Sequence, residues 1–263
     1  MRALSKFSSL VHNENIKIYS RARTWIMLLL LAIFSVLIPV LMYVSSSAES
    51  RPGMWNGFQI TVSVIFYLNM IFTVVIASDA VAGEFSWGTI KLLLIRPWSR
   101  SKILLSKYIS MVLFSVLTTV LLVVCAYAAS LILLPSGSET MTQSGWSPEM
   151  FSAMFVLCRY VELFLTAALA FMVSSVFRAS GLAIGLSLFI IFVKNLFIGF
   201  FNPDHYEWAN YLPFSHMDLS GYLASNTGPG GATLGFSIAV LAAYYAVFLL
   251  LSWIVFNRRD VAG

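Results

Sequence analysis

Six apolar stretches, each long enough to cross a membrane, account for most of this 263-residue chain. A helix rises 1.5 Å per residue, so about 20 apolar residues are needed to span the hydrocarbon core of a bilayer. No stretch shows the two-residue alternation of polarity that is typical of a membrane β-strand. The sequence therefore predicts an all-α integral membrane protein with six transmembrane helices. The predicted spans are Trp25 to Val44, Phe58 to Ser78, Ile109 to Leu134, Met150 to Phe177, Gly181 to Phe201 and Ala232 to Phe256.

The composition and the missing motifs exclude most enzyme classes. Hydrophobic residues make up 59% of the chain and charged residues only 10%, which is outside the range of soluble globular domains. The two cysteines, Cys125 and Cys158, lie inside predicted spans, where a small apolar role is ordinary. The phosphate-binding pattern G-x-x-x-x-G-K-[ST] does not occur, and neither does H-E-x-x-H or G-x-S-x-G. We therefore expect no catalytic residue, no metal and no bound cofactor in this chain.

Basic residues are distributed unevenly over the connections between the predicted spans. Cytoplasmic loops of membrane proteins carry an excess of Lys and Arg. One set of connections holds only Arg51 against six acidic residues, whereas thirteen of the sixteen Lys and Arg residues lie in the other set. We therefore expect a multi-pass protein of the cell membrane with both termini cytoplasmic. Orientation and contact with anionic lipid explain the net charge of +5, and no nucleic-acid partner is needed.

The segment ahead of the first span has the periodicity of an amphipathic helix. Over residues 3–19, one helical face carries Leu4, Phe7, Val11 and Ile18. This pattern favours a helix that lies in the cytoplasmic membrane interface. The alternative is an unstructured basic leader, because Glu14 lies at the edge of the apolar stripe.

Residues 202–231 form the longest expected extracellular element. Its aromatic residues suit the headgroup layer, which favours a short interfacial or re-entrant helix over a folded domain. Metal binding is not expected, because the possible ligands lack a short, recognisable spacing. These ligands are Asp204, His205, His216 and Asp218.

Two local patterns concern the later spans. Ser147 and Pro148 are placed as N-cap and first-turn residue of the fourth span. Gly181 and Gly185 have the G-x-x-x-G spacing that lets a second helix backbone approach closely.

Three ionisable residues lie within predicted spans: Arg159, Glu162 and Lys194. Arg159 and Glu162 are three residues apart, so they share a helix face and can pair. An unpaired charge near mid-bilayer costs about 2.5–3.5 kcal/mol on insertion scales. The three residues could line a translocation path in the outer half of the membrane. Alternatively, Arg159 and Glu162 form a structural ion pair while Lys194 extends toward the outer headgroups.

The segment GEFSWGTIKLLLIRPWSRSK, residues 83–102, is too apolar for a solvated loop and too short for a span. Gly88 ends the preceding helix, Thr89 can cap a new one, and Pro97 stops it after less than two turns. We expect a short helix parallel to the membrane, which docks a soluble partner through exposed apolar side chains. These are Trp87, Leu92, Leu93, Ile95 and Trp98. The alternative is a turn whose leucines rest in the lipid interface.

This segment resembles a loop of a known family. Its residues follow the pattern E-x-x-x-G-T-x-x-x-L-L-x-x-P-x-S-R-x-x-x-x-x-S-K, from Glu84 to Lys107. The pattern is similar to the cytoplasmic loop of ABC transporter permeases of the type-2 exporter family, which includes bacitracin-resistance, lantibiotic-immunity and sodium-extrusion permeases. The layout of the whole chain resembles a single permease domain over residues 1–263. The specific sequence signal lies between Asp79 and Lys107.

The resemblance implies that the loop is a coupling helix, seated in a cleft of a separate ABC ATP-binding subunit. It also implies a second permease chain, identical or related, with ATP and Mg²⁺ bound in the ATPase subunits. The N-terminal helix would pack beside the same ATPase surface. The residues expected to dock the ATPase are Glu84, Trp87, Gly88, Thr89, Leu92, Leu93, Ile95, Pro97 and Arg100.

The leading hypothesis is the permease subunit of an ATP-driven exporter of an amphipathic peptide, antibiotic or drug-like compound. A first alternative is an ATP-independent secondary transporter or ion channel that works through Arg159, Glu162 and Lys194. Such proteins often show internal repeats and broken spans near the midplane, which are not evident in this sequence. A second alternative is a membrane sensor or scaffold, which would bind a soluble partner without moving a solute.

Overall fold

The computed structural model of the chain describes residues 2–47, 50–90, 92, 98–136, 145–201, 203, 205–225 and 227–258. Six of the helices in these ranges are long and apolar enough to cross a membrane, and the same ranges contain no strand. The predicted all-α class with six spans is therefore confirmed. The long helices are α1 (Arg2–Tyr19), α2 (Ala22–Ser45), α3 (Met54–Ser86), α5 (Arg100–Leu133), α6 (Pro148–Val176), α7 (Ser180–Phe200) and α9 (Leu234–Arg258).

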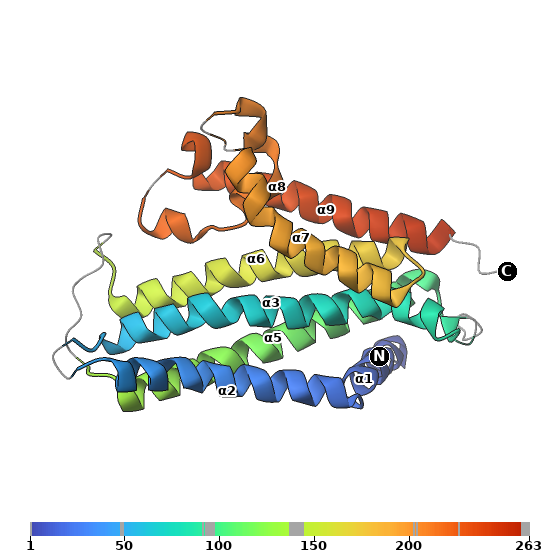
Figure 1. Cartoon of the computed structure of the whole chain (residues 1–263). Coiled ribbons are helices and arrows are strands. Elements are labelled where there is room, and N and C mark those ends of the chain that lie inside the picture. Colours follow the sequence, from blue (N-terminus) through green and yellow to red (C-terminus); the bar gives the residue numbers. More distant parts are fainter. Residues whose placement is uncertain are drawn as a thin grey trace.

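The helix α3 is at the centre of the bundle and packs against α2, α5, α6 and α7 (Figure 1). Helix α9 lies against α6. Helix α1 lies across one end of the bundle, the end at which the α3–α5 connection, the α6–α7 connection and the C-terminal end of α9 are also found. We call this end of the bundle the loop end. It collects most of the basic residues that the structure describes, including Lys17, Arg21, Arg100, Lys107 and Arg178.

Close packing between α3 and α6 depends on small residues. The Ser174 hydroxyl of α6 accepts hydrogen bonds from the backbone nitrogens of Val81 and Ala82 in α3, at 3.0 Å each. Small and hydroxyl side chains let membrane helices approach and bond to one another in this way. At 33 residues, α3 is about 50 Å long, well beyond the thickness of the hydrocarbon core. Its final turns therefore extend past the predicted span and carry charged residues at the loop end.

Two local predictions about helix ends are confirmed. Gly88 follows α3 with a φ of +69°, a left-handed conformation that ends the helix and favours glycine. At the start of α6, the Ser147 hydroxyl accepts a hydrogen bond from the Met150 nitrogen at 3.4 Å, and Pro148 occupies the first turn.

No helix in the described part of this chain approaches Gly181 and Gly185 closely. A Cβ atom added to either glycine would meet no atom within 4 Å. Helix α7 packs on its neighbours through a different face, which carries Ala183 and Ile191. The G-x-x-x-G spacing identifies a helix face without side chains, but it does not show which face of the helix packs on the bundle.

Residues 203–231, where described, form short helical turns that pack on α6 and α9. The turns are η1 (Glu207–Tyr211), α8 (Pro213–His216), η2 (Ser220–Leu223) and η3 (Pro229–Gly231). His216 is buried, and its ring nitrogens lie 2.7 Å from the Asn210 carbonyl and 2.7 Å from the Ser237 hydroxyl. Asp204 lies outside the described residues. The buried His216 therefore serves packing of this segment onto α9.

Candidate functional site

The N-terminal helix α1 is docked onto α5 at the loop end, so it is part of the bundle. Leu10 is buried in a core cluster with Ile103 and Met111 of α5. The Ser110 hydroxyl of α5 donates a hydrogen bond to the Val11 carbonyl at 3.2 Å. The predicted helix is present, and its buried face includes Glu14, which the sequence pattern had placed at the edge of the apolar stripe.

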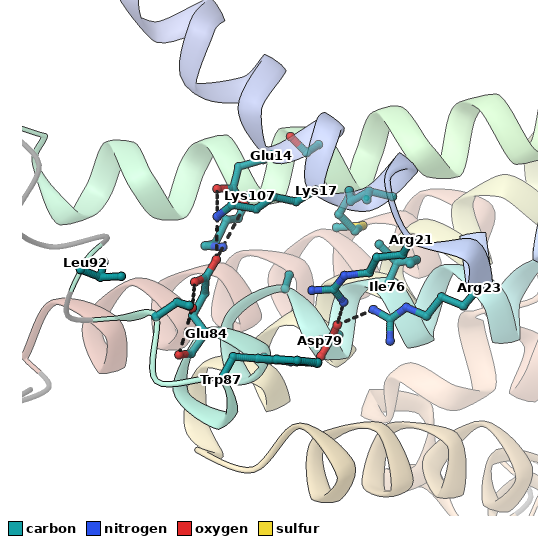
Figure 2. A pocket seen from close by; sticks show the side chains of 16 residues that line it. Glu14, Lys17, Arg21, Arg23, Ile76, Asp79, Glu84, Trp87, Leu92 and Lys107 are labelled. Atoms are coloured by element: carbon teal, nitrogen blue, oxygen red, sulfur yellow. Dashed lines mark hydrogen bonds and ion pairs between the residues drawn. The ribbon is translucent and has the colours of Figure 1, made fainter. Parts of the chain in front are cut away.

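Glu14 belongs to an ion-pair network around a buried lysine (Figure 2). Lys107 of α5 is only 3% exposed, and its Nζ lies 2.9 Å from Glu14 Oε2 and 2.8 Å from Glu84 Oε1. Lys17 Nζ lies 2.8 Å from Glu14 Oε1 and 2.8 Å from Glu84 Oε1. We call these four residues the lysine–glutamate network. It contains two cations and two carboxylates, and it connects α1, α3 and α5.

The α1 side of this network favours the charged forms of both of its residues. Burial alone would raise the pKa of Glu14, but the ammonium groups of Lys107 and Lys17 outweigh it and hold that pKa below its ordinary value. Burial alone would lower the pKa of Lys17, but hydrogen bonds to Glu14 and Glu84 raise it above its ordinary value. Both residues of α1 are therefore ionised across the physiological range.

Glu84 is oriented into the molecule. Besides the two lysines, its carboxylate accepts a hydrogen bond from the Thr89 hydroxyl, on the other side of the Gly88 turn. Among the residues expected to dock an ATPase, Glu84 thus fixes the start of the connection instead of presenting its charge outward. The sequence resemblance placed Glu84 at this start but contained no information on where its side chain points.

The other residues expected to dock an ATPase fall into three groups. Trp87 and Leu92 project from the surface, with exposures of 73% and 68%, and Gly88 and Thr89 are also exposed. Arg100 Nη1 donates to the Asn257 carbonyl at 3.0 Å and so joins α5 to the end of α9. Three further predicted docking residues lie outside the described residues: Leu93, Ile95 and Pro97.

A second cluster at the loop end is centred on Asp79. Arg21, at the corner between α1 and α2, and Arg23 of α2 both donate to Asp79 Oδ2 (Figure 2). The Ser180 hydroxyl at the start of α7 donates to the other carboxylate oxygen, Oδ1. One carboxylate therefore holds together the α1–α2 corner, α3 and α7.

A pocket of about 420 Å³ lies between the Asp79 cluster and the lysine–glutamate network. Its walls come from α1, α2, α3 and α5, and from the start of the α3–α5 connection. The lining is mixed: charged side chains of both clusters alternate with Ile18, Ile76, Met111, Trp87 and Leu92. A pocket of this volume falls in the range of small-ligand sites.

The three ionisable residues predicted inside spans also come together, between the middle of the bundle and the end away from the loop end. Glu162 accepts from Arg159 Nη1 at 3.0 Å through Oε2 and from Lys194 Nζ through Oε1. Arg159 Nη1 also lies 3.5 Å from Asp218 Oδ2. The alternative in which Lys194 extends toward the outer headgroups is wrong, because the ammonium is buried against Glu162. The adjoining cavity of about 10 Å³ has space for roughly one water molecule.

The six long apolar helices define a multi-pass membrane protein. The chain belongs to the family described as "Protein of unknown function (DUF2705)", whose model matches residues 24–262. It is 32% identical to the uncharacterized protein YhcI of Bacillus subtilis, over 97% of this chain and 99% of that protein. It is 26% identical to the uncharacterized membrane protein YdbK of the same organism, over 93% of this chain and 99% of that protein.

A further relative has a name that refers to transport. The chain is 28% identical to the probable ABC transporter permease protein NosY of Stutzerimonas stutzeri, over 86% of this chain and 90% of that protein. Homology to proteins of this name confirms the resemblance observed in the loop sequence. It supports a permease role for the chain, as a transport subunit.

The buried lysine provides a direct test of the network. We expect Lys107→Met to destabilise the protein by about 3–5 kcal/mol, because it leaves two adjacent carboxylates with one cation. Hydrogen exchange of the α1 amides and the thermal midpoint in detergent would measure this effect. Adding Glu84→Gln to the same chain restores charge balance and should recover much of the loss. The exposed Lys102→Met is the matched control, and an equal effect of both lysine variants would contradict the assignment.

The pKa of Glu14 determines how the docking of α1 depends on pH. This pKa is lowered on folding. The contribution of Glu14 to the stability of the docked helix is therefore complete above the ordinary value of 4.5, and it is lost as pH falls through the lowered value. Because the pKa of Lys17 is raised, the stabilising contribution of Lys17 is lost only at alkaline pH above 10.5. We expect exchange protection of α1, corrected for intrinsic rates, to stay constant between pH 5 and 9 and to fall below about pH 4.5. Loss of protection already at pH 6–7 would be inconsistent with this network.

Charge balance also predicts the behaviour of the Glu162 cluster. Glu162→Gln leaves Arg159 and the buried Lys194 with Asp218 alone, so we expect a loss of about 3–5 kcal/mol of stability. The double variant Glu162→Gln/Lys194→Met removes one charge of each sign and should be markedly more stable than the single variant. Thermal unfolding in detergent measures both, with the exposed Glu149→Gln as the control. If the double variant were no better than the single one, Lys194 would not be paired with Glu162.

Proposed function

We propose that this chain is the permease subunit of an ATP-driven ABC exporter, located in the cell membrane with both termini in the cytoplasm. A separate ABC ATPase subunit would bind ATP and Mg²⁺ and hydrolyse the nucleotide. A second permease chain, identical or related, would complete the membrane part. We expect the substrate to be an amphipathic peptide, antibiotic or drug-like compound.

The observation that carries this proposal is a pair of exposed apolar side chains on a connection whose first residues are firmly held by the bundle. Trp87 and Leu92 project from the α3–α5 connection at the loop end. Tryptophan is enriched among residues that dominate binding at protein interfaces. The connection starts from Glu84, which is fixed by Lys107, Lys17 and Thr89. Because the connection is anchored in this way, a partner that binds the exposed side chains could transmit its own movement to the helices of the bundle.

The helix arrangement supplies a route for this movement. A displacement of the connection acts directly on the ends of α3 and α5, and the lysine–glutamate network extends it to α1. Helix α3 continues without interruption from Ser86 to Met54, so its two ends move together. Because α3 contacts four other long helices, its movement would rearrange the bundle as a whole.

Basic side chains at the loop end support the proposed orientation. By the positive-inside rule, an end that collects Lys and Arg is favoured on the cytoplasmic side. A cytoplasmic loop end would bring Trp87 and Leu92 to the side of the membrane on which ATP is available. Relatives named as ABC transporter permeases support the choice of an ABC ATPase as the partner.

The ion-channel alternative has one structural observation in its favour. The three residues it requires do converge in the bundle, and Asp218 joins them. Their charges are paired, however, and the adjoining cavity is small. Ion flux through liposomes that contain this chain alone would support the channel and oppose the exporter.

Docking can be tested by co-expressing this chain with ABC ATP-binding proteins of the same organism and identifying the one that co-purifies with it. We expect Trp87→Ala and Leu92→Asp each to reduce the recovered ATPase subunit and the substrate-stimulated ATPase activity by about tenfold or more, as for a hot-spot residue. Trp208→Ala is the matched control, because Trp208 is a tryptophan at the opposite end with an exposure of 52%. Unchanged recovery and activity in both variants would refute the docking role. Recovery without any substrate stimulation in the unaltered complex would instead favour a scaffold.

A further inference from the structure

The two halves of the 420 Å³ pocket differ in charge. On one side, the lysine–glutamate network is balanced, with two cations and two carboxylates. On the other side, two guanidinium groups share one carboxylate, that of Asp79. The pocket therefore carries one surplus positive charge, and this charge is located at Arg21 and Arg23.

The two arginines also have unused hydrogen-bond donors. Each guanidinium offers five N–H groups. Arg21 uses Nη1 and Arg23 uses Nη2, and both donate to the same oxygen, Asp79 Oδ2. The other oxygen of Asp79 is occupied by Ser180. Arg23 Nε is buried and has no acceptor within the described residues. Asp79 thus leaves donors free for a second anionic group.

The position of the arginines indicates the depth of this site. Arg21 and Arg23 directly precede the predicted first span, and Asp79 directly follows the predicted second span. All three therefore lie at the level of the lipid headgroups. The exposed Trp25 is anchored at the same level by a 2.8 Å hydrogen bond from its Nε1 to the Tyr19 carbonyl, as is typical of interfacial aromatic residues.

Apolar residues follow the charged residues of the pocket along both α3 and α2. Ile76 is part of the pocket wall, next to Asp79. Along α2, Ile26, Leu29 and Ile33 follow the arginines and are exposed on the surface of the helix. A molecule with an anionic head and an apolar tail would match this sequence of surfaces.

We propose that the pocket binds the phosphodiester headgroup of one acidic phospholipid of the phosphatidylglycerol type. A phosphodiester carries one negative charge, which matches the surplus charge at Arg21 and Arg23. Its two free oxygens suit the forked donors of a guanidinium, which bind phosphate in a bidentate manner. The pocket volume also suits a headgroup. The bound lipid contacts the α1–α2 corner and α3 beside the lysine–glutamate network. This assignment does not depend on the transported substrate.

The test compares lipid binding to the full-length chain in detergent, by native mass spectrometry with phosphatidylglycerol or phosphatidylcholine. The variant Arg21→Gln/Arg23→Gln/Asp79→Asn removes the donors without leaving a buried, unpaired carboxylate. We expect the binding of phosphatidylglycerol relative to phosphatidylcholine to fall about tenfold in this variant, since each basic residue near an anionic lipid contributes appreciably to binding. Lys102→Gln is the matched control: it causes the same change of net charge at the same end of the molecule, and it should retain the preference.

Three outcomes would overturn the assignment. The triple variant could retain the lipid preference while its thermal midpoint shows that it is folded. The Lys102→Gln control could lose as much as the triple variant, which would indicate general attraction to a basic surface. Inorganic phosphate at millimolar concentration could displace phosphatidylglycerol completely, which would identify a soluble phosphate compound as the occupant. A single adduct that prefers phosphatidylglycerol, resists phosphate and is lost only in the triple variant supports the proposal.

Discussion

A lysine ammonium can be buried in a helix bundle only when it is neutralised, and Lys107 imposes this requirement at the loop end. An uncompensated charge in such a position costs several kcal/mol, so its partners are held in place by electrostatics as well as by packing. The partners come from two different helices: Glu14 from α1 and Glu84 from the end of α3. One buried cation therefore sets the position of the N-terminal helix together with the end of α3 and the start of the exposed connection.

This arrangement changes the interpretation of the N-terminal helix. An amphipathic helix ahead of a first span is usually regarded as an attachment to the lipid surface. Here α1 also packs its own leucine into the protein core and shares carboxylates with α3 and α5. Because Asp79 joins the α1–α2 corner to α3 and α7, the loop end is braced at two points. The connection with Trp87 thus projects from a region in which five helices are joined by charged groups. In the same region, the Ser174 hydroxyl joins α6 to the backbone of α3.

The helices were predictable from the sequence because a backbone in hydrocarbon must satisfy its hydrogen bonds internally, so apolar length alone indicates a span. Local signals at Gly88 and Ser147 were also sufficient, since helix ends depend on neighbouring residues. The candidate site was harder to predict from the sequence. Glu14 lies 93 residues from Lys107, and periodicity describes one helix at a time, so the carboxylate looked like a defect in an apolar stripe. An acid among apolar positions of a basic helix was the signal that could have identified it. The pairing of Lys194 likewise depends on how α7 is rotated against α6, which no single-helix pattern contains.

The cluster of Arg159, Glu162, Lys194 and Asp218 has a consequence for how the protein responds to the membrane potential. A single charge that moves across the full potential changes in energy by about 2.3 kcal/mol per 100 mV. These four groups carry two positive and two negative charges, and ion pairs hold them together. If they move as one unit, the electrical work on the cations cancels that on the carboxylates. The half of the bundle away from the loop end can therefore contain four ionised groups and still rearrange with little dependence on voltage.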